Sequence, residues 1–326
     1  MNVIPQNYIR VEPKVLSNFV VVLAQKAGMS EPNARFLAEQ LVNNDLRGVF
    51  SHGTQQIATY ARIMRDGFIN PNPKVRIVNE TSATLVVDGD GGLGYFPANK
   101  AALELVARCR ANGIAVGVSR NHGHIGAAGI YARLLAEHGL IAYVTSGHQL
   151  TLDSSDSIMR AAGGSPMSFA VPAGKSPAMV LDFGTMHDLY ADSPHVDEIY
   201  NLAPGLVFRS MGLGFVCQAL GGFLAGVPVD EQRSHRRYKG ANQGALIIAI
   251  DITQFTSLED FHREMDEFVE RTSQMQPLPG HDRATLPGIL EWEREQDWRE
   301  MGIPVDYSHR NILRGVADEF GVELPF

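Results

Sequence analysis

From Thr84 onward the chain alternates short β-branched runs with helical segments, and this alternation constrains the fold more than any other feature of the sequence. Apolar runs of strand length predict strands at 85–87, 114–118, 140–144, 168–171, 179–182 and 245–250. Helices are expected at 98–111 and 128–137, and the glycine-rich stretch 212–224 is typical of a buried helix. Strands that alternate with helices indicate an α/β core.

Segments with helical patterns flank this core at both ends of the chain, and those after the core are rich in charged residues. Before the core they predict a helix over 14–27, a second helix that the Ser30 hydroxyl caps and that runs to Asn43 or Asn44, and a third that ends at Gly67. After the core, helices are expected at 258–270, 289–301 and 307–320.

The turn-forming run 70–73 separates the first helices from the core and indicates a domain boundary. We predict an N-terminal helical domain over 1–75 and an α/β domain over 76–256. The helices of 257–326 are expected to pack back on the N-terminal domain. A length of 326 residues suits two domains, or one large domain with an added helical layer.

Charge and cysteine content argue against several classes of protein. The chain has 28 Lys+Arg and 36 Asp+Glu, a net charge of −8. Phosphate binding needs clustered cations, so neither nucleic acid nor an anionic membrane is expected as a partner. Cys109 and Cys217 lie far apart without a CxxC motif, so a disulfide framework is not expected and a cytoplasmic location is. No apolar run approaches the ~20 residues of a membrane-spanning helix.

The loop 89–94 matches GxGxxG, follows an apolar strand and precedes a helix, as a Rossmann dinucleotide site requires. Two features weaken this interpretation. Tyr95–Pro97 intrudes before the helix can direct its first N–H groups at a pyrophosphate, and the next strand ends in Ser119–Asn121 rather than in an acidic ribose partner. A strand-to-helix turn that needs positive φ angles is the favoured alternative.

Histidines in two loops are candidates for proton transfer. Ser51-His52-Gly53 lies between two predicted helices, where an imidazole can titrate near neutral pH or simply be solvated. Asn121-His122-Gly123-His124 follows a strand, and an extended backbone would direct both rings to the same side. Zinc is disfavoured because no third ligand is obvious, and no metal site is expected. No Ser–His–acid or Cys–His–acid set supports covalent catalysis.

Three further features each allow two interpretations. Asp182, at the end of a predicted strand, either orients a histidine or caps a turn. Gln56 follows the Ser-His-Gly triplet as a polar binding group or as helix surface. The basic residues Arg236, Arg237 and Lys239 form a solvated turn or an anion contact.

Taken together, several motifs resemble the malate/L-lactate dehydrogenase family of non-Rossmann oxidoreductases, which includes ureidoglycolate, sulfolactate and diketogulonate dehydrogenases and cyclic imino acid reductases. The segments that carry the resemblance are 45–48, 51–53, 88–94, 120–126 with Tyr131, 163–172, 211–214, 286–288 and 301–304. The resemblance implies an L-sulfolactate dehydrogenase-like α/β fold, in which a mixed sheet has flanking helices and a helical layer from both termini. It also implies a homodimer whose active site lies between domains, near the partner subunit.

The resemblance further assigns roles to residues of this chain. His52 matches the proton donor, Ser51 and His124 match residues of the same pocket, and Asp182 matches the acidic residue after the following strand. A nicotinamide cofactor, NAD or NADP, is implied against about 146–172 and the helix start near Met211. The candidate substrate-binding residues are Arg47, Gln56, Asn121, His122 and His187. The candidate cofactor-binding residues are His148, Gly163, Gly164, Ser165, Met211 and Gly212.

The chain departs from the family pattern at several of these positions. Gln56 replaces an arginine that forks onto a substrate carboxylate, and a glutamine cannot make that cationic contact. Gly163-Gly164-Ser165-Pro166 replaces a Gly-Thr-Asn-Pro turn, and Met211 replaces a lysine. The first hypothesis is an NAD(P)H-dependent oxidoreductase of a small 2-oxo or 2-hydroxy acid or a cyclic imine, with His52 as acid/base. The alternative is a divergent member that has lost the cofactor and catalyses isomerisation, hydration or elimination.

Overall fold

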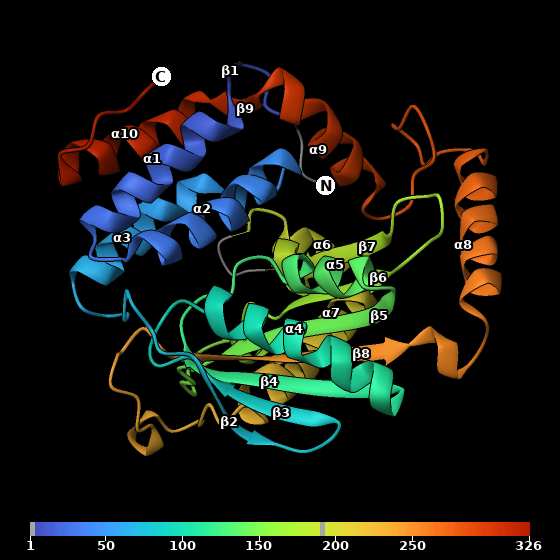
Figure 1. Ribbon diagram of the computed structural model, residues 1–326, viewed down its shortest axis with the longest axis horizontal. Coiled ribbons are helices and arrows are strands. Elements are labelled where there is room, and N and C mark those ends of the chain that lie inside the picture. The colour runs from blue at the N-terminus through green and yellow to red at the C-terminus, as the bar shows by residue number, and fades with distance from the viewer. Residues whose placement is uncertain (1–3, 190–192) are drawn as a thin grey trace. The chain divides into compact units, whose positions relative to one another are not determined.

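The computed structural model describes residues 4–189 and 193–326, and the chain divides into two compact units (Figure 1). One unit combines both ends of the chain, Met1–Pro73 with Gly288–Phe326, and we call it the terminal unit. The other is the central unit, Lys74–Pro287. Each unit is described by itself.

The central unit contains a seven-stranded sheet in the order β2-β3-β4-β8-β5-β6-β7. Its strands are β2 (Arg76–Glu80), β3 (Thr84–Asp88), β4 (Ile114–His122), β5 (Leu140–His148), β6 (Pro166–Val171), β7 (Met179–Gly184) and β8 (Gln243–Asp251). Only β3 and β4 pair in parallel, and every other pair is antiparallel. The predicted mixed-sheet α/β fold is therefore confirmed. β4 and β5 both run antiparallel to β8, so the carboxyl ends of β3, β4 and β5 meet at one edge of the sheet.

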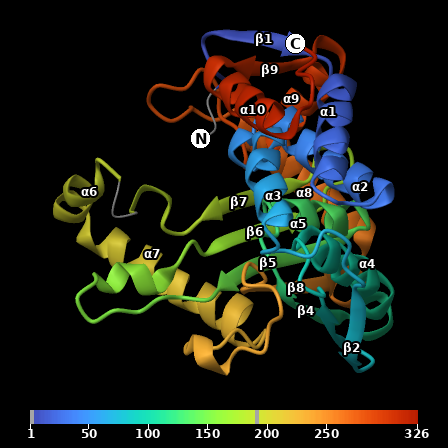
Figure 2. The same cartoon turned by 90° about the vertical axis from the view of Figure 1, so that its left-hand side faces the viewer.

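Helices cover both faces of this sheet (Figure 2). The two amphipathic helices α4 (Tyr95–Asn112) and α5 (Gly129–Glu137) pack on one face, and α7 (Pro204–Cys217) lies on the other. α7 continues as a π-helical turn over Gln218–Phe223 that packs against β5 and β8. The remaining helices of this unit are α6 (Val196–Leu202) and α8 (Leu258–Ser273).

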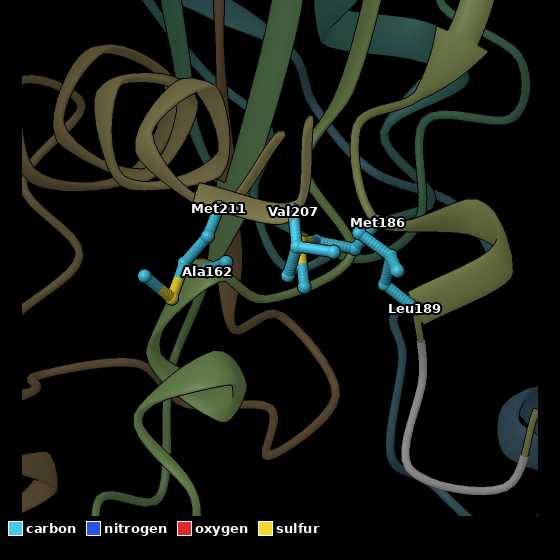
Figure 3. Close-up of a cluster of buried hydrophobic side chains, with 5 residues drawn as sticks. All are labelled: Ala162, Met186, Leu189, Val207 and Met211. Atoms are coloured by element: carbon cyan, nitrogen blue, oxygen red, sulfur yellow. The ribbon is translucent and has the colours of Figure 1, made fainter. Parts of the chain in front are cut away.

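The buried side chains of the first half of α7 belong to a small apolar cluster. Val207 and Met211 of α7 lie beside Ala162 and beside the buried side chains of Met186 and Leu189 (Figure 3). An 18-residue window of the segment Pro204–Phe223 has a mean hydropathy of 1.3, so the length and composition of this segment would also suit a membrane span. The prediction that no apolar run approaches that length is therefore wrong. Because α7 and its continuation pack on the sheet through one side, a core helix accounts for the composition equally well.

The terminal unit is helical. It contains α1 (Pro13–Lys26), α2 (Glu31–Leu46), α3 (Ile57–Arg65), α9 (Ile289–Met301) and α10 (Tyr307–Phe320). β1 (Tyr8–Val11) pairs antiparallel with β9 (Ile303–Asp306), which ties the first residues of the unit to its last segment. The buried face of α1 contains Leu16, Phe19, Val20 and Leu23 of the predicted apolar stripe, whereas the buried face of α2 also includes the polar residues Asn44 and Asp45.

Some local expectations differ from the structure. Ser30 occupies the N-cap position of α2, but its hydroxyl makes no cap hydrogen bond, so that prediction is wrong. Instead the Ser30 N–H donates to Asn72 Oδ1 at 2.7 Å. The helix predicted at 258–270 is α8, and it belongs to the central unit rather than to the terminal one. There Asp266 accepts the N–H groups of Gly174, Lys175 and Ser176 in the turn between β6 and β7.

Candidate active site

His52 ends a 3-10 turn, Phe50–His52, that follows α2. Its ring is partly buried, and the Ser51 hydroxyl lies 3.0 Å from its Nδ1 atom. Burial lowers the pKa of His52 below its ordinary value of 6.5. The imidazole is therefore mainly neutral at pH 7, which suits a base that accepts a proton from a substrate hydroxyl.

Hydrogen bonds and a ring contact from side chains of the terminal unit hold this turn in place. The Gln55 amide donates to the carbonyl of Phe50 at 2.8 Å, and the Gln56 amide donates to the carbonyl of Ser51 at 2.6 Å. The Phe50 ring stacks on Trp298 with a centroid distance of 5.9 Å. Gln56 therefore serves the conformation of the turn.

Arg47, a predicted substrate-binding residue, lies at the C-terminal end of α2. Its guanidinium forms an ion pair with Glu295 of α9, and both side chains are only 12% exposed. A buried carboxylate that already neutralises this cation reduces its value as an anchor for a substrate carboxylate.

Four polar residues that the sequence analysis did not single out individually lie beneath the His52 turn. Asn44, Asp45, Thr54 and His309 are all buried. Asp45 Oδ2 accepts the Thr54 hydroxyl at 2.6 Å and the Thr54 N–H at 3.0 Å, and Thr54 Oγ1 lies 3.0 Å from His309 Nε2. Burial raises the pKa of Asp45 to about 7 and lowers the pKa of His309 to about 4. Asp45 stands in the Asp-Leu-Arg-Gly motif, which was the one available signal.

The second histidine motif lies in the central unit, where β4 ends. His122 is fully buried, and its ring nitrogens lie 2.9 Å from Ser119 Oγ and 2.7 Å from the carbonyl oxygen of Gly123. Burial lowers the pKa of His122 to about 4. Asn121 has a φ of 54°, so the backbone is not extended there, and the reason given for both rings facing one side is wrong. His122 is a buried, hydrogen-bonded residue of the fold.

The glycine-rich loop packs directly against this motif. Its amides at Gly89, Gly91 and Gly94 donate to the carbonyls of Arg120, Asn121 and His124, each at 2.9 Å. A Cβ atom at Gly94 would lie 2.5 Å from Ile125 Cγ2, and Gly91 has a φ of 76°. These N–H groups donate to carbonyls of the protein and are therefore not free for a pyrophosphate. The loop is a strand-to-helix turn, which agrees with the favoured alternative to a Rossmann loop.

A cavity of about 320 Å³ lies beside this motif, at the carboxyl ends of β3 and β4. Asn121 lines it; its amide donates to Asp88 Oδ1 at 2.9 Å, and its Oδ1 atom has no hydrogen-bond partner among the described residues. The predicted basic cluster contributes Arg236, which pairs with Glu231 and donates to Ser234 at 3.0 Å. Arg236 thus holds its own loop together. His124 is partly buried.

Asp182 and His187 lie in and after β7. Asp182 Oδ2 accepts the Gly129 N–H, the first of α5, at 3.0 Å, so the carboxylate caps a distant helix rather than a turn of its own. His187 is exposed in a short turn. His52 and Ser51 belong to the terminal unit, and the other histidine motif belongs to the central unit. That they share one pocket stays a prediction.

The predicted cofactor-binding residues gather around the end of β5 and the middle of α7. Because α7 begins at Pro204, the prediction of a helix start near Met211 is wrong. His148 ends β5, and Gln218 of the π-helical turn clamps its main chain, accepting its N–H at 3.2 Å and donating to its carbonyl at 2.7 Å. Gly163 has a φ of 61°, and a Cβ atom there would lie 3.0 Å from His148 Cε1. Burial lowers the pKa of His148.

Other candidates in this group are internal contacts. The Ser165 hydroxyl donates to the carbonyl of Ala162 and lies 3.0 Å from that of Gly214. Met211 points into the apolar cluster of Figure 3, and Gly164 follows the Gly163 turn. Gly212 has open space where a side chain would be.

Two groups near this region fit a nicotinamide nucleotide. The Thr185 hydroxyl is buried without a hydrogen-bond partner among the described residues, and its N–H donates to the Ser165 carbonyl at 3.2 Å. Arg209, exposed on α7 three residues before Gly212, has no ion pair within the described part of the chain. An orphan hydroxyl suits a ribose or carboxamide group, and an unpaired guanidinium suits a phosphate. Residues 4–189 and 193–326 contain no group of three or more His, Cys, Asp or Glu that could hold a metal ion.

Comparison with known proteins gives one consistent result. The family model described as "Malate/L-lactate dehydrogenase" matches residues 11–187 and 196–314. A malate dehydrogenase of Pyrococcus horikoshii is 28% identical, with 98% of both chains covered. Its solved structure superposes with a TM-score of 0.84 over 99% of both chains at 27% identity.

Two further relatives are similar over most of the chain. The NAD(+) ureidoglycolate dehydrogenase of Escherichia coli O157:H7 is 26% identical, with 86% of both chains covered. The solved structure of a sulfolactate dehydrogenase from Methanocaldococcus jannaschii shares the fold, with a TM-score of 0.77 at 22% identity over 97% of this chain and 98% of the other.

Proposed function

The chain belongs to the malate/L-lactate dehydrogenase family of oxidoreductases, and from that premise we propose that it is an NAD(P)H-dependent enzyme of a small 2-oxo or 2-hydroxy acid, or of a cyclic imine. The resemblance inferred from the sequence motifs is thereby confirmed. The relatives named above are dehydrogenases and give no support to the cofactor-independent alternative. A homodimer in the cytoplasm belongs to the same proposal.

The observation that carries the proposal is the environment of His52. Its ring is partly buried, has a lowered pKa and keeps the Ser51 hydroxyl 3.0 Å from Nδ1. A neutral imidazole held in this way accepts the proton of a substrate hydroxyl when the alcohol is oxidised. In the opposite direction the protonated ring would donate its proton to the oxygen or nitrogen of the carbonyl or imine group whose carbon accepts the hydride. Such proton transfer contributes about 10²- to 10⁴-fold to a rate.

The cofactor would be held in the central unit. The Thr185 hydroxyl and the main chain around Gly163 are suited to its uncharged parts, and Arg209 is suited to a phosphate. When bound, a nicotinamide supplies or accepts the hydride. The protein residues orient the ligands and move the proton.

Calorimetric titration with NADH and with NADPH tests the proposal, followed by a screen of 2-hydroxy acids for cofactor reduction at alkaline pH. We expect one dinucleotide to bind in the micromolar range and at least one acid to be oxidised. Failure of both dinucleotides to bind at millimolar concentration would overturn the dehydrogenase assignment and leave the cofactor-independent alternative.

A further inference from the structure

We infer that Asp45, Thr54 and His309 form a buried positioning network that fixes the Ser51-His52-Gly53 turn and thereby orients the His52 ring for proton transfer. This inference rests on the proposed role of His52. The three residues come from α2, from the turn after His52 and from α10, so the network joins both ends of the terminal unit.

The contacts form a continuous chain of hydrogen bonds. Thr54 is its centre, because its hydroxyl and its N–H both reach Asp45 Oδ2 while the same hydroxyl lies 3.0 Å from His309 Nε2. The main-chain N–H of His309 donates to Asp306 Oδ1 at 2.7 Å, and this bond fixes the start of α10. The Thr54 hydroxyl donates its one proton to Asp45, and its oxygen can accept a hydrogen from His309 Nε2, so it holds both neighbours in place.

The network touches the turn through its main chain. A Cβ atom at Gly53 would lie only 1.6 Å from Asp45 Oδ1, so the backbone of Gly53 rests directly on the carboxyl group. Asn44, the residue before Asp45, donates from Nδ2 to the carbonyl of His52 at 2.9 Å. Two successive residues of α2 therefore determine where His52 lies.

Stability alone does not explain this arrangement. Asp45, Thr54 and Asn44 are completely buried, and Asp45 Oδ1 and Asn44 Oδ1 have no hydrogen-bond partner among the described residues. Unsatisfied buried polar atoms cost free energy that an apolar core would avoid. Buried polar groups are retained in some proteins because they specify a single conformation, and here the conformation specified is that of the His52 turn.

The test compares two substitutions at the centre of the network. Thr54→Val keeps the shape but removes the hydroxyl, whereas Thr54→Ser keeps the hydroxyl. We expect kcat to fall at least tenfold in Thr54→Val, with KM for the cofactor within twofold of wild type, and we expect Thr54→Ser to stay within threefold. Circular dichroism at the assay temperature confirms that both variants are folded.

Thr253→Val is the matched control. Thr253 makes the same pair of bonds in the central unit, donating its hydroxyl at 2.8 Å and its N–H at 3.1 Å to Asp251 Oδ1. We expect this control to keep wild-type kcat. Equal losses in Thr54→Val and Thr253→Val, or in Thr54→Val and Thr54→Ser, would overturn the network.

A second readout separates this inference from the proposed function. The ring of His52 is followed by NMR in protein labelled with 15N-histidine, without substrate or cofactor, and its signals are assigned with His52→Gln. We expect Thr54→Val to change the titration midpoint or the tautomer of His52, and Thr54→Ser and Thr253→Val to leave both unchanged. An unchanged His52 in Thr54→Val refutes the network. Failure of wild type to bind either dinucleotide refutes the proposed function alone.

Discussion

In the terminal unit side chains hold the His52 turn, whereas in the central unit main-chain amides hold the loop that carries His122 and His124. The Asn44 amide donates to the carbonyl of His52, the Asp45 carboxyl lies against the backbone of Gly53, and the Thr54 hydroxyl donates to Asp45. The second loop is fixed by hydrogen bonds from the glycine-rich loop to its carbonyl oxygens.

This difference determines what each loop tolerates. A loop held by side chains can be changed one polar group at a time, and its histidine remains partly exposed, with a pKa that burial lowers below 6.5. The second loop depends mainly on glycine amides, which no side-chain substitution removes, and its buried histidine has both ring nitrogens engaged, by the Ser119 hydroxyl and the Gly123 carbonyl. Reactivity is therefore expected in the first loop and rigidity in the second.

Paired histidine substitutions test this division with the largest expected effect. His52→Gln should lower kcat by about 10²- to 10⁴-fold, because the proton-transfer group is lost, and change the free energy of unfolding by less than about 1 kcal/mol. His122→Gln should instead lower the free energy of unfolding by about 1–3 kcal/mol, because buried hydrogen bonds are broken. Steady-state kinetics and urea unfolding measure the two quantities.

The exposed His281 provides the control for both substitutions. His281→Gln should match wild type in kcat and in urea midpoint. The division fails if His52→Gln loses stability without losing turnover, or if His122→Gln is as stable as wild type.

Glycine substitution tests the rigid loop. Gly94→Ala would bring a Cβ atom 2.6 Å from the Gly123 carbonyl oxygen and 2.5 Å from Ile125 Cγ2. Neither neighbour is the end of a flexible side chain, so we expect the free energy of unfolding to fall by about 3 kcal/mol. Gly315→Ala, in α10 with nothing within 4 Å, should raise it by about 0.5–1 kcal/mol. Equal urea midpoints for the two variants would contradict the packing of this loop.

Local patterns in the sequence predict much of the fold. The helix over 289–301 and the last helix, 307–320, were predicted with their observed ends, because a charged segment with helical composition is a local signal. β1 and β9 were missed. Each has only four residues, and they pair across almost the whole chain, so neither shows a pattern of its own.

In the candidate site, too, local motifs could be predicted from the sequence, whereas contacts between distant residues could not. Motifs identified Ser51 and His52, but the network beneath them depends on His309, which is 255 residues from Thr54 and meets it only through the fold. The error at His122 has a local cause. Alternation along a strand assumes an extended backbone, and the positive φ of Asn121 breaks that assumption within the motif.

The pH dependence of turnover sharpens the comparison further. Because burial lowers the pKa of His52 below 6.5, the neutral ring predominates at pH 7. Oxidation of a hydroxy acid should therefore rise about tenfold per pH unit at acid pH and level off with a midpoint below 6.5. Reduction should fall through the same midpoint as the pH rises. A pH profile of kcat/KM in both directions measures this, since kcat/KM reports the free enzyme, and a midpoint above 7 would contradict a buried, neutral base.

The substitution Gln56→Arg has the smallest expected effect. It tests whether a cation placed on the His52 turn can bind the carboxylate of a substrate. Gln56 is partly exposed and only braces the Ser51 carbonyl, while Arg47 is already paired with Glu295. A guanidinium at position 56 should raise kcat/KM for a 2-hydroxy acid about fivefold relative to the corresponding amide, as expected for an exposed ion pair of roughly 1 kcal/mol. Gln55→Arg is the control, since it adds the same charge one residue away. An equal gain in both variants would mean that the charge acts only at long range, and no gain in either would mean that the substrate carboxylate does not approach this turn.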